Sequence, residues 1–76
     1  MARGWIHTVY RSDTRNWANE VEGGDRASSV HSNKVEAVSR GRELAQNAKT
    51  EHVIHNQDGT IGERNSYGND PYPPAG

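Results

Sequence analysis

The chain has 76 residues, of which 30% are hydrophobic, and it contains neither Cys nor Phe. Nine Lys or Arg residues against ten Asp or Glu residues leave a formal net charge of −1, which argues against a strongly basic nucleic-acid module. The lack of Cys excludes disulfides and cysteine-based zinc sites. No apolar run is long enough for a membrane span, and the N-terminus lacks the apolar stretch of a signal peptide, so we expect a cytoplasmic protein.

A chain of this length has room for one domain, and its core must be small. The large apolar side chains available to that core are Trp5, Ile6, Val9, Trp17, Val21, Val30, Val35, Val38, Leu44, Val53, Ile54 and Ile61. Small domains commonly supplement such a core with disulfides, a metal or a second subunit. Because disulfides are excluded, we expect association between subunits.

The N-terminal third has the pattern of a β-hairpin followed by a short strand. Residues 4–11 are rich in side chains that favour strands, residues 12–16 have turn chemistry, and residues 17–22 alternate again. Two such runs joined by a few polar residues predict a hairpin. A second turn at residues 23–25 then leads into a short third strand at residues 26–31.

Residues 34–49 have the pattern of a helix. Asn33 is a suitable N-cap, and Glu36 three residues later completes a variant of the capping box. Small and apolar residues recur at three- and four-residue steps, which predicts a thin stripe suited to close approach to a sheet. The stripe consists of Val35, Val38, Gly41, Leu44, Ala45 and Ala48.

The C-terminal part has the pattern of a second hairpin and a tail. Residues 51–56 and 60–64 are predicted strands, and Asp58-Gly59 between them is a strong turn signal. We therefore expect a single α+β domain over residues 1–65, with an antiparallel sheet and one α-helix packed on one of its faces. Residues 66–76 form a predicted extended tail rich in Pro and Gly, and the opposite face of the sheet stays open to water or a partner.

Several fragments, in this order and spacing, resemble one known family. They are residues 26–31, the pair Glu36-Ala37, residues 42–45, residues 53–55 with 58–61, and residues 66–74. Together they are similar to a family of small bacterial proteins catalogued as domain of unknown function 2188, over nearly the whole chain from Ile6. One departure is Asn19, where the family usually has an apolar residue. The resemblance implies a compact α+β fold and a bacterial or phage source, and it transfers no activity.

The four histidines do not have the spacing of a metal site. His52 and His55 are three residues apart, which places them on opposite faces of a strand, and His7 and His31 can join either one only through tertiary folding. We therefore expect no metal and no other cofactor. We assign His55 to hydrogen bonds with the following turn, such as with Asp58, and His31 to the loop before the helix.

The sequence also lacks the pattern of an enzyme. Ser28, Ser29 and His31 are close together, but no acidic residue is placed to orient the histidine. The glycine pair at residues 23–24 does not directly precede a helix, so it is not a dinucleotide-binding loop. We expect a non-catalytic protein.

The leading hypothesis for function is an interaction module that self-associates as a homodimer. It depends on the small number of apolar side chains and on a sheet that one helix covers on one side only. The predicted interface residues are Trp17, Val21 and Trp5.

The alternative is a module that binds single-stranded nucleic acid. Aromatic side chains on the sheet would stack on bases, while basic residues of the helix would contact phosphates. The predicted contacts are Arg40, Lys49 and Tyr10, although the chain lacks the overall basic charge expected of such a protein.

Overall fold

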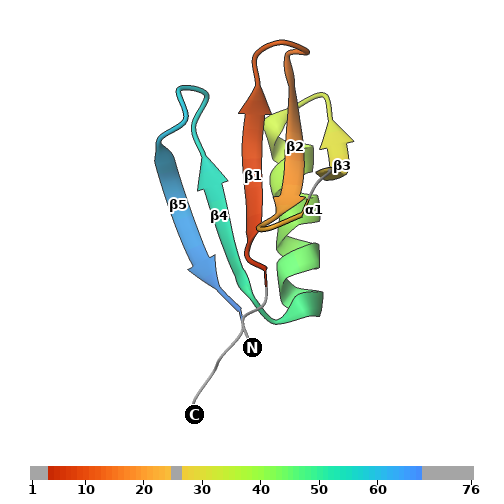
Figure 1. Cartoon of the computed structure of the whole chain (residues 1–76), viewed down its shortest axis with the longest axis vertical. Helices are drawn as coiled ribbons and strands as arrows, with labels where there is room; N and C mark the ends of the chain where they lie inside the picture. The colour runs from red at the N-terminus through yellow and green to blue at the C-terminus, as the bar shows by residue number, and fades with distance from the viewer. Residues whose placement is uncertain (1–3, 25–26, 68–76) are drawn as a thin grey trace.

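A computed structural model describes residues 4–24 and 27–67 of the chain (Figure 1). Its elements are β1 (Ile6–Arg11), β2 (Asn16–Val21), β3 (Ala27–His31), α1 (Lys34–Ala48), β4 (Glu51–His55) and β5 (Ile61–Ser66). One helix packs against a five-stranded sheet, which confirms the predicted α+β class and the predicted order of elements. Within the described ranges, no helix has the length and apolar character needed to cross a bilayer.

The strands form one sheet in the order β3-β2-β1-β4-β5, so β3 and β5 are the edges. Three of the four strand pairs are antiparallel, as predicted, but β1 and β4 are parallel. The parallel pair follows from the position of α1 in the chain. The helix carries the chain from β3 back across the sheet, so β4 enters beside β1 in the same direction.

The strand register divides the side chains between two faces of the sheet. The helix face, which packs against α1, includes Thr8 and Tyr10 of β1 together with their β2 partners Asn19 and Trp17. The residues that alternate with these lie on the opposite side, which we call the open face. Figure 1 shows α1 on one side of the sheet, behind β1, β2 and β3 in that view.

The predicted capping of α1 is confirmed. Asn33 Oδ1 accepts a hydrogen bond from the backbone N–H of Glu36 at 2.9 Å. At the other end Lys49 adopts a left-handed conformation with φ of 54°, and its N–H donates to carbonyl oxygens of the last turn. Such a cap is usually glycine, so this end of the helix carries some strain.

The stripe that α1 buries differs from the predicted one. The buried residues are Ala37, Gly41 and Ala45, whereas Val35 is 79% exposed. Assigning Val35 and Ala48 to the packed stripe was therefore wrong, because both are exposed, and Ala37 was missed. The reason is steric, because a row of small side chains at four-residue steps lets the helix lie close to the sheet.

The core is small and partly polar. Its buried apolar residues are Ile6, Trp17, Ala18, Ala37, Ala45, Val53 and Ile54. Four polar residues are buried with them: Thr8, Asn19, Thr50 and His52. A core of this composition needs hydrogen-bond partners for its polar groups as well as apolar contact.

Strand β5 lies outside the part of the sheet that α1 covers. In the described part of the chain, α1 contacts the other four strands but not β5, and five of the six residues of β5 are exposed. Beyond the strand, the N–H of Tyr67 donates to the carbonyl of Thr50 at 3.2 Å. Residues 68–76, most of the predicted tail, lie outside the described residues.

Candidate functional site

A hydrogen-bonded polar cluster lies at the centre of the helix face. Thr8 Oγ1 is 2.6 Å from Asn19 Oδ1 and 2.7 Å from His52 Nε2. The amide nitrogen of Asn19 donates to the carbonyl of Ala37 in α1 at 2.9 Å and to Ser29 Oγ in β3 at 3.1 Å. Asn19 therefore ties β1, β2, β3 and α1 together.

Gly41 of α1 lies directly against this cluster on the helix side. A Cβ at this position would lie 2.5 Å from His52 Nε2, 2.6 Å from Asn19 Oδ1 and 2.8 Å from Thr8 Oγ1. Real side chains do not approach so closely, and all three contacted atoms belong to fully buried residues. The close approach of the helix to the polar cluster therefore requires glycine at position 41.

The hydrogen bonds of the cluster fix which ring nitrogen of His52 carries a proton. The single proton of the Thr8 hydroxyl is donated to Asn19 Oδ1, so Thr8 accepts its second bond from the Nε2–H of His52. Burial lowers the pKa of His52, and the positive charge of Arg42 lowers it further, against a smaller opposite effect of Glu63. His52 is thus a neutral, fully buried structural group that no substrate can reach.

A second group of polar side chains lies on the open face. His55 Nε2 is 2.9 Å from His7 Nδ1, and His7 Nε2 is 2.9 Å from Glu22 Oε1. Since a carboxylate only accepts, His7 carries its proton on Nε2, and its Nδ1 accepts from the Nε2–H of His55. The side chains of His7 and Glu22 are 24% and 59% exposed, so solvent reaches this chain of three groups.

These contacts differ from the roles predicted for the histidines. His55 contacts His7 rather than the turn that follows it, and Asp58 instead accepts bonds from the backbone N–H and hydroxyl of Thr60. Those bonds lower the pKa of the Asp58 carboxyl. The predicted placement of His52 and His55 on opposite faces is confirmed, but their partners are set by tertiary folding.

Two ion pairs join neighbouring strands on the open face. They are Arg11–Glu20 at 3.1 Å and Arg64–Glu51 at 3.2 Å, with the Arg64 guanidinium 5.3 Å from the centre of the Trp5 ring. On the same face, Ala18 and Val53 are only 0% and 2% exposed. Part of the apolar surface of the open face is therefore already shielded from solvent.

The three predicted interface residues occupy different environments. Trp17 is 6% exposed on the helix face, where its ring lies 5.1 Å from that of Tyr10 and beneath the ammonium of Lys34. Trp5 and Val21 are 36% and 37% exposed. Accessible surface is therefore available at Trp5 and Val21, and little is available at Trp17.

The three predicted nucleic-acid contacts lie apart. Tyr10 packs on Trp17 near the start of α1, whereas Lys49 caps the other end of the helix. Arg40 is exposed and pairs with Glu43 at 2.9 Å. The structure does not bring these three side chains into one surface.

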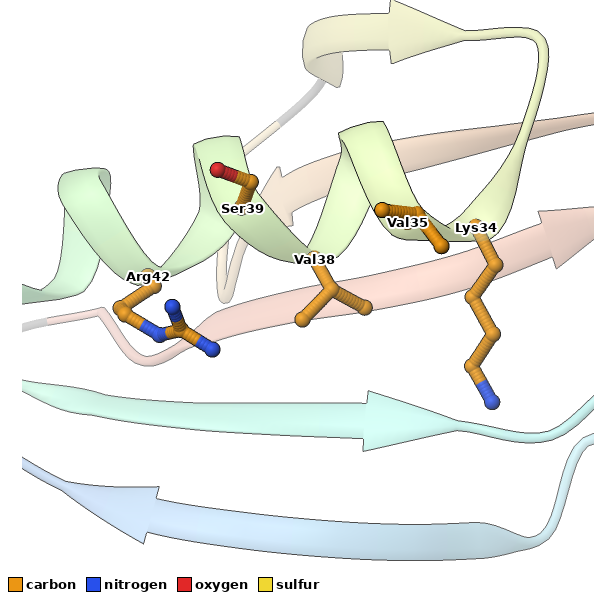
Figure 2. A pocket seen from close by; sticks show the side chains of 5 residues that line it. All are labelled: Lys34, Val35, Val38, Ser39 and Arg42. Atoms are coloured by element: carbon orange, nitrogen blue, oxygen red, sulfur yellow. The ribbon is translucent and has the colours of Figure 1, made fainter.

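An open groove of about 420 Å³ runs along α1 (Figure 2). It is lined by Lys34, Val35, Val38, Ser39 and Arg42. In Figure 2 the side chains of Lys34, Val38 and Arg42 extend from the same side of the helix. The groove is therefore rimmed by the cations Lys34 and Arg42.

No group of three or more potential metal-binding side chains occurs within residues 4–24 and 27–67.

Comparison with known proteins gives the family. Residues 6–67 match the family described as "Uncharacterized protein conserved in bacteria (DUF2188)". The chain belongs to this family. The resemblance expected from the sequence fragments is thereby confirmed.

A relative of the chain comes from Bacillus subtilis (strain 168). It is the "Uncharacterized protein YdaT", which is 36% identical to this chain over 47 residues. The match covers 62% of this chain but only 31% of YdaT, so the chain spans about a third of that relative. No solved structure matches the chain.

Proposed function

We propose that this DUF2188 member is a cytoplasmic, non-catalytic interaction module that self-associates as a homodimer through strand β5. The observation that carries the proposal is the exposure of β5. The strand lies at an edge of the sheet, α1 does not contact it, and five of its six residues are exposed. An uncovered edge strand is a template for pairing with another chain.

The backbone of β5 offers hydrogen-bonding groups at that edge. Tyr67 donates its N–H inward to Thr50, and in an antiparallel pair such inward groups alternate along the strand. The N–H groups of Asn65 and Glu63 therefore also face β4, while those of Arg64 and Ser66 face outward. No proline interrupts β5, so these outward donors are available to a partner strand.

A second copy of the chain is the partner that this edge fits best. Pairing of β5 with β5 around a two-fold axis closes after two copies, whereas pairing of β5 with β3 would continue into a filament. Among the predicted interface residues, Trp5 lies beside this edge because its ring contacts Arg64 of β5. Burial of Trp5 at the junction would supplement the small core.

Sedimentation velocity over a dilution series tests the proposal. Ser66→Pro removes an outward N–H without removing a bond to β4, so we expect it to weaken the dimer by at least tenfold, or about 1.4 kcal/mol. Ser66→Ala is the matched control, since it loses the same hydroxyl but keeps the N–H. A wild-type protein that stays monomeric at high concentration, or a Ser66→Pro variant that dimerises normally, would contradict the proposal.

The binding of single-stranded nucleic acid is retained as a second candidate because Lys34 and Arg42 rim the same groove (Figure 2). It predicts that a labelled mixed oligonucleotide binds at low salt and dissociates as salt rises. Arg42→Ala and Arg40→Ala would each weaken binding, while Arg11→Ala on the open face would not. Unchanged fluorescence anisotropy of the oligonucleotide at low salt would exclude this candidate.

A further inference from the structure

We propose that His7 and His55 together bind one divalent transition-metal ion, of the Zn²⁺ class, on the open face of the sheet. The two side chains come from the neighbouring parallel strands β1 and β4. Their nitrogens Nδ1 of His7 and Nε2 of His55 face each other at 2.9 Å, and their ring centres are 5.2 Å apart. Imidazole nitrogen is a preferred ligand for zinc, copper and nickel.

Glu22 prepares His7 for this role. Its carboxylate oxygen lies 2.9 Å from His7 Nε2 and accepts a hydrogen bond from the N–H there, which leaves the lone pair on Nδ1 facing His55. A carboxylate behind a histidine in this way fixes the tautomer and increases the basicity of a metal ligand. Without metal, His55 donates its Nε2–H to His7 Nδ1, so binding of the ion to both nitrogens requires the proton of His55 to be on its Nδ1 instead.

The distance between the two nitrogens suits a shared ion after a small adjustment. Two nitrogens about 2.1 Å from a tetrahedral zinc are about 3.4 Å apart, so the pair must open by about half an ångström. Both side chains are partly exposed, which leaves room for that rotation. Water would fill the remaining coordination positions, because the described residues supply no third protein ligand to such a group.

The other two histidines lack these features and serve as internal comparisons. His52 is fully buried, and its Nε2 is held by Thr8. His31 bonds to Ser29 Oγ at 3.0 Å and has no carboxylate partner among residues 4–24 and 27–67. A metal that bound histidines without regard to geometry would also bind at His31.

Calorimetric titration of the full chain with zinc chloride tests the site. We expect one saturable zinc ion per chain, with His7→Ala and His55→Ala each weakening binding at least about tenfold. Glu22→Gln keeps both ligands but removes the carboxylate, and we expect a loss of about tenfold. His31→Ala is the control and should bind zinc with wild-type affinity.

Nuclear magnetic resonance of the wild-type protein provides a second measurement that does not depend on the folding of variants. Zinc should shift the ring signals of His7 and His55 and leave those of His31 and His52 in place. No saturable binding, wild-type affinity in His7→Ala and His55→Ala, or a shift confined to His31 would each overturn the proposal. Because the site is separate from the β5 edge, Ser66→Pro should bind zinc normally even if it fails to dimerise.

Discussion

Two histidines on one strand illustrate how the two faces of this sheet differ. His52 and His55 are three residues apart on β4. His52 is fully buried beneath Gly41 and bonded to Thr8, whereas His55 is partly exposed and bonded to His7. A histidine on the helix face is a structural group, because burial favours its neutral form and keeps ligands away from it. A histidine on the open face remains accessible to a ligand.

The difference extends to the faces as a whole. The helix face is held by buried hydrogen bonds that cannot be exchanged for water, and small residues of α1 close it. The open face is held by ion pairs that water and salt weaken. We infer that stability rests mainly on the helix face, and that the open face and the β5 edge are free for binding.

The substitution Gly41→Ala should have the largest effect on this balance. In an ordinary exposed helix position, the change from glycine to alanine stabilises a helix by up to about 1 kcal/mol. Here the added Cβ would lie 2.5 Å from His52 Nε2 and force α1 away from the sheet. We expect the free energy of unfolding in urea to fall by about 3 kcal/mol, or the variant not to fold.

Gly62→Ala is the matched control for that measurement. The three atoms nearest to its Cβ belong to the exposed side chain of Asn56, which can shift at the cost of one exposed hydrogen bond to Thr60. We expect a change below about 0.5 kcal/mol for an exposed substitution of this kind. Equal stability of Gly41→Ala and the wild-type protein would show that α1 does not depend on close approach to the polar cluster.

Thr8→Val should have the next largest effect. Valine has nearly the shape of threonine, but it leaves Asn19 Oδ1 and His52 Nε2 without their shared partner in a buried environment. We expect a loss of about 2 kcal/mol in the free energy of unfolding. Thr14→Val, at an exposed turn, is the control, and an equally small effect at both positions would contradict a structural role for the cluster.

The sequence predicts those features of the fold that depend on residues close together in the chain. The N-cap at Asn33, the Asp58-Gly59 turn and the alternation of His52 and His55 each depend on residues close together in the chain, and each is confirmed. The order of the elements follows from the same local patterns, and the predicted limits differ from the observed ones by no more than two residues.

The remaining features depend on contacts between distant segments. The parallel pairing of β1 with β4 brings His7 beside His55 across 48 positions, and no local pattern indicates it. The predicted packed stripe of α1 included Val35 because this residue is apolar. In the structure Val35 is exposed and small residues are buried instead, because they let the helix lie close to the polar cluster. Asn19 was marked as unusual by the resemblance, but its partners appear only after folding.

The acid sensitivity of the protein should also originate on the helix face. The folded state lowers the pKa of His52 below its ordinary value of 6.5, so the unfolded chain binds more protons once the pH falls below that value. Stability should therefore decrease as the pH falls from about 6.5 toward the folded pKa, and this decrease should be smaller in a His52→Gln variant. Urea titrations at several pH values measure it, and a wild-type profile that is flat below pH 6.5 would contradict it.

The smallest expected effect concerns the open face. Arg11 and Glu20 pair at 3.1 Å, with side chains 37% and 40% exposed. A double-mutant cycle with Arg11→Ala and Glu20→Ala should give a coupling of about 0.5 kcal/mol that declines as salt is added. A coupling above about 2 kcal/mol that is insensitive to salt would contradict a minor role of this ion pair in stability. The open face would then hold the fold as firmly as the buried cluster does, and a ligand could bind there only by breaking contacts on which stability depends.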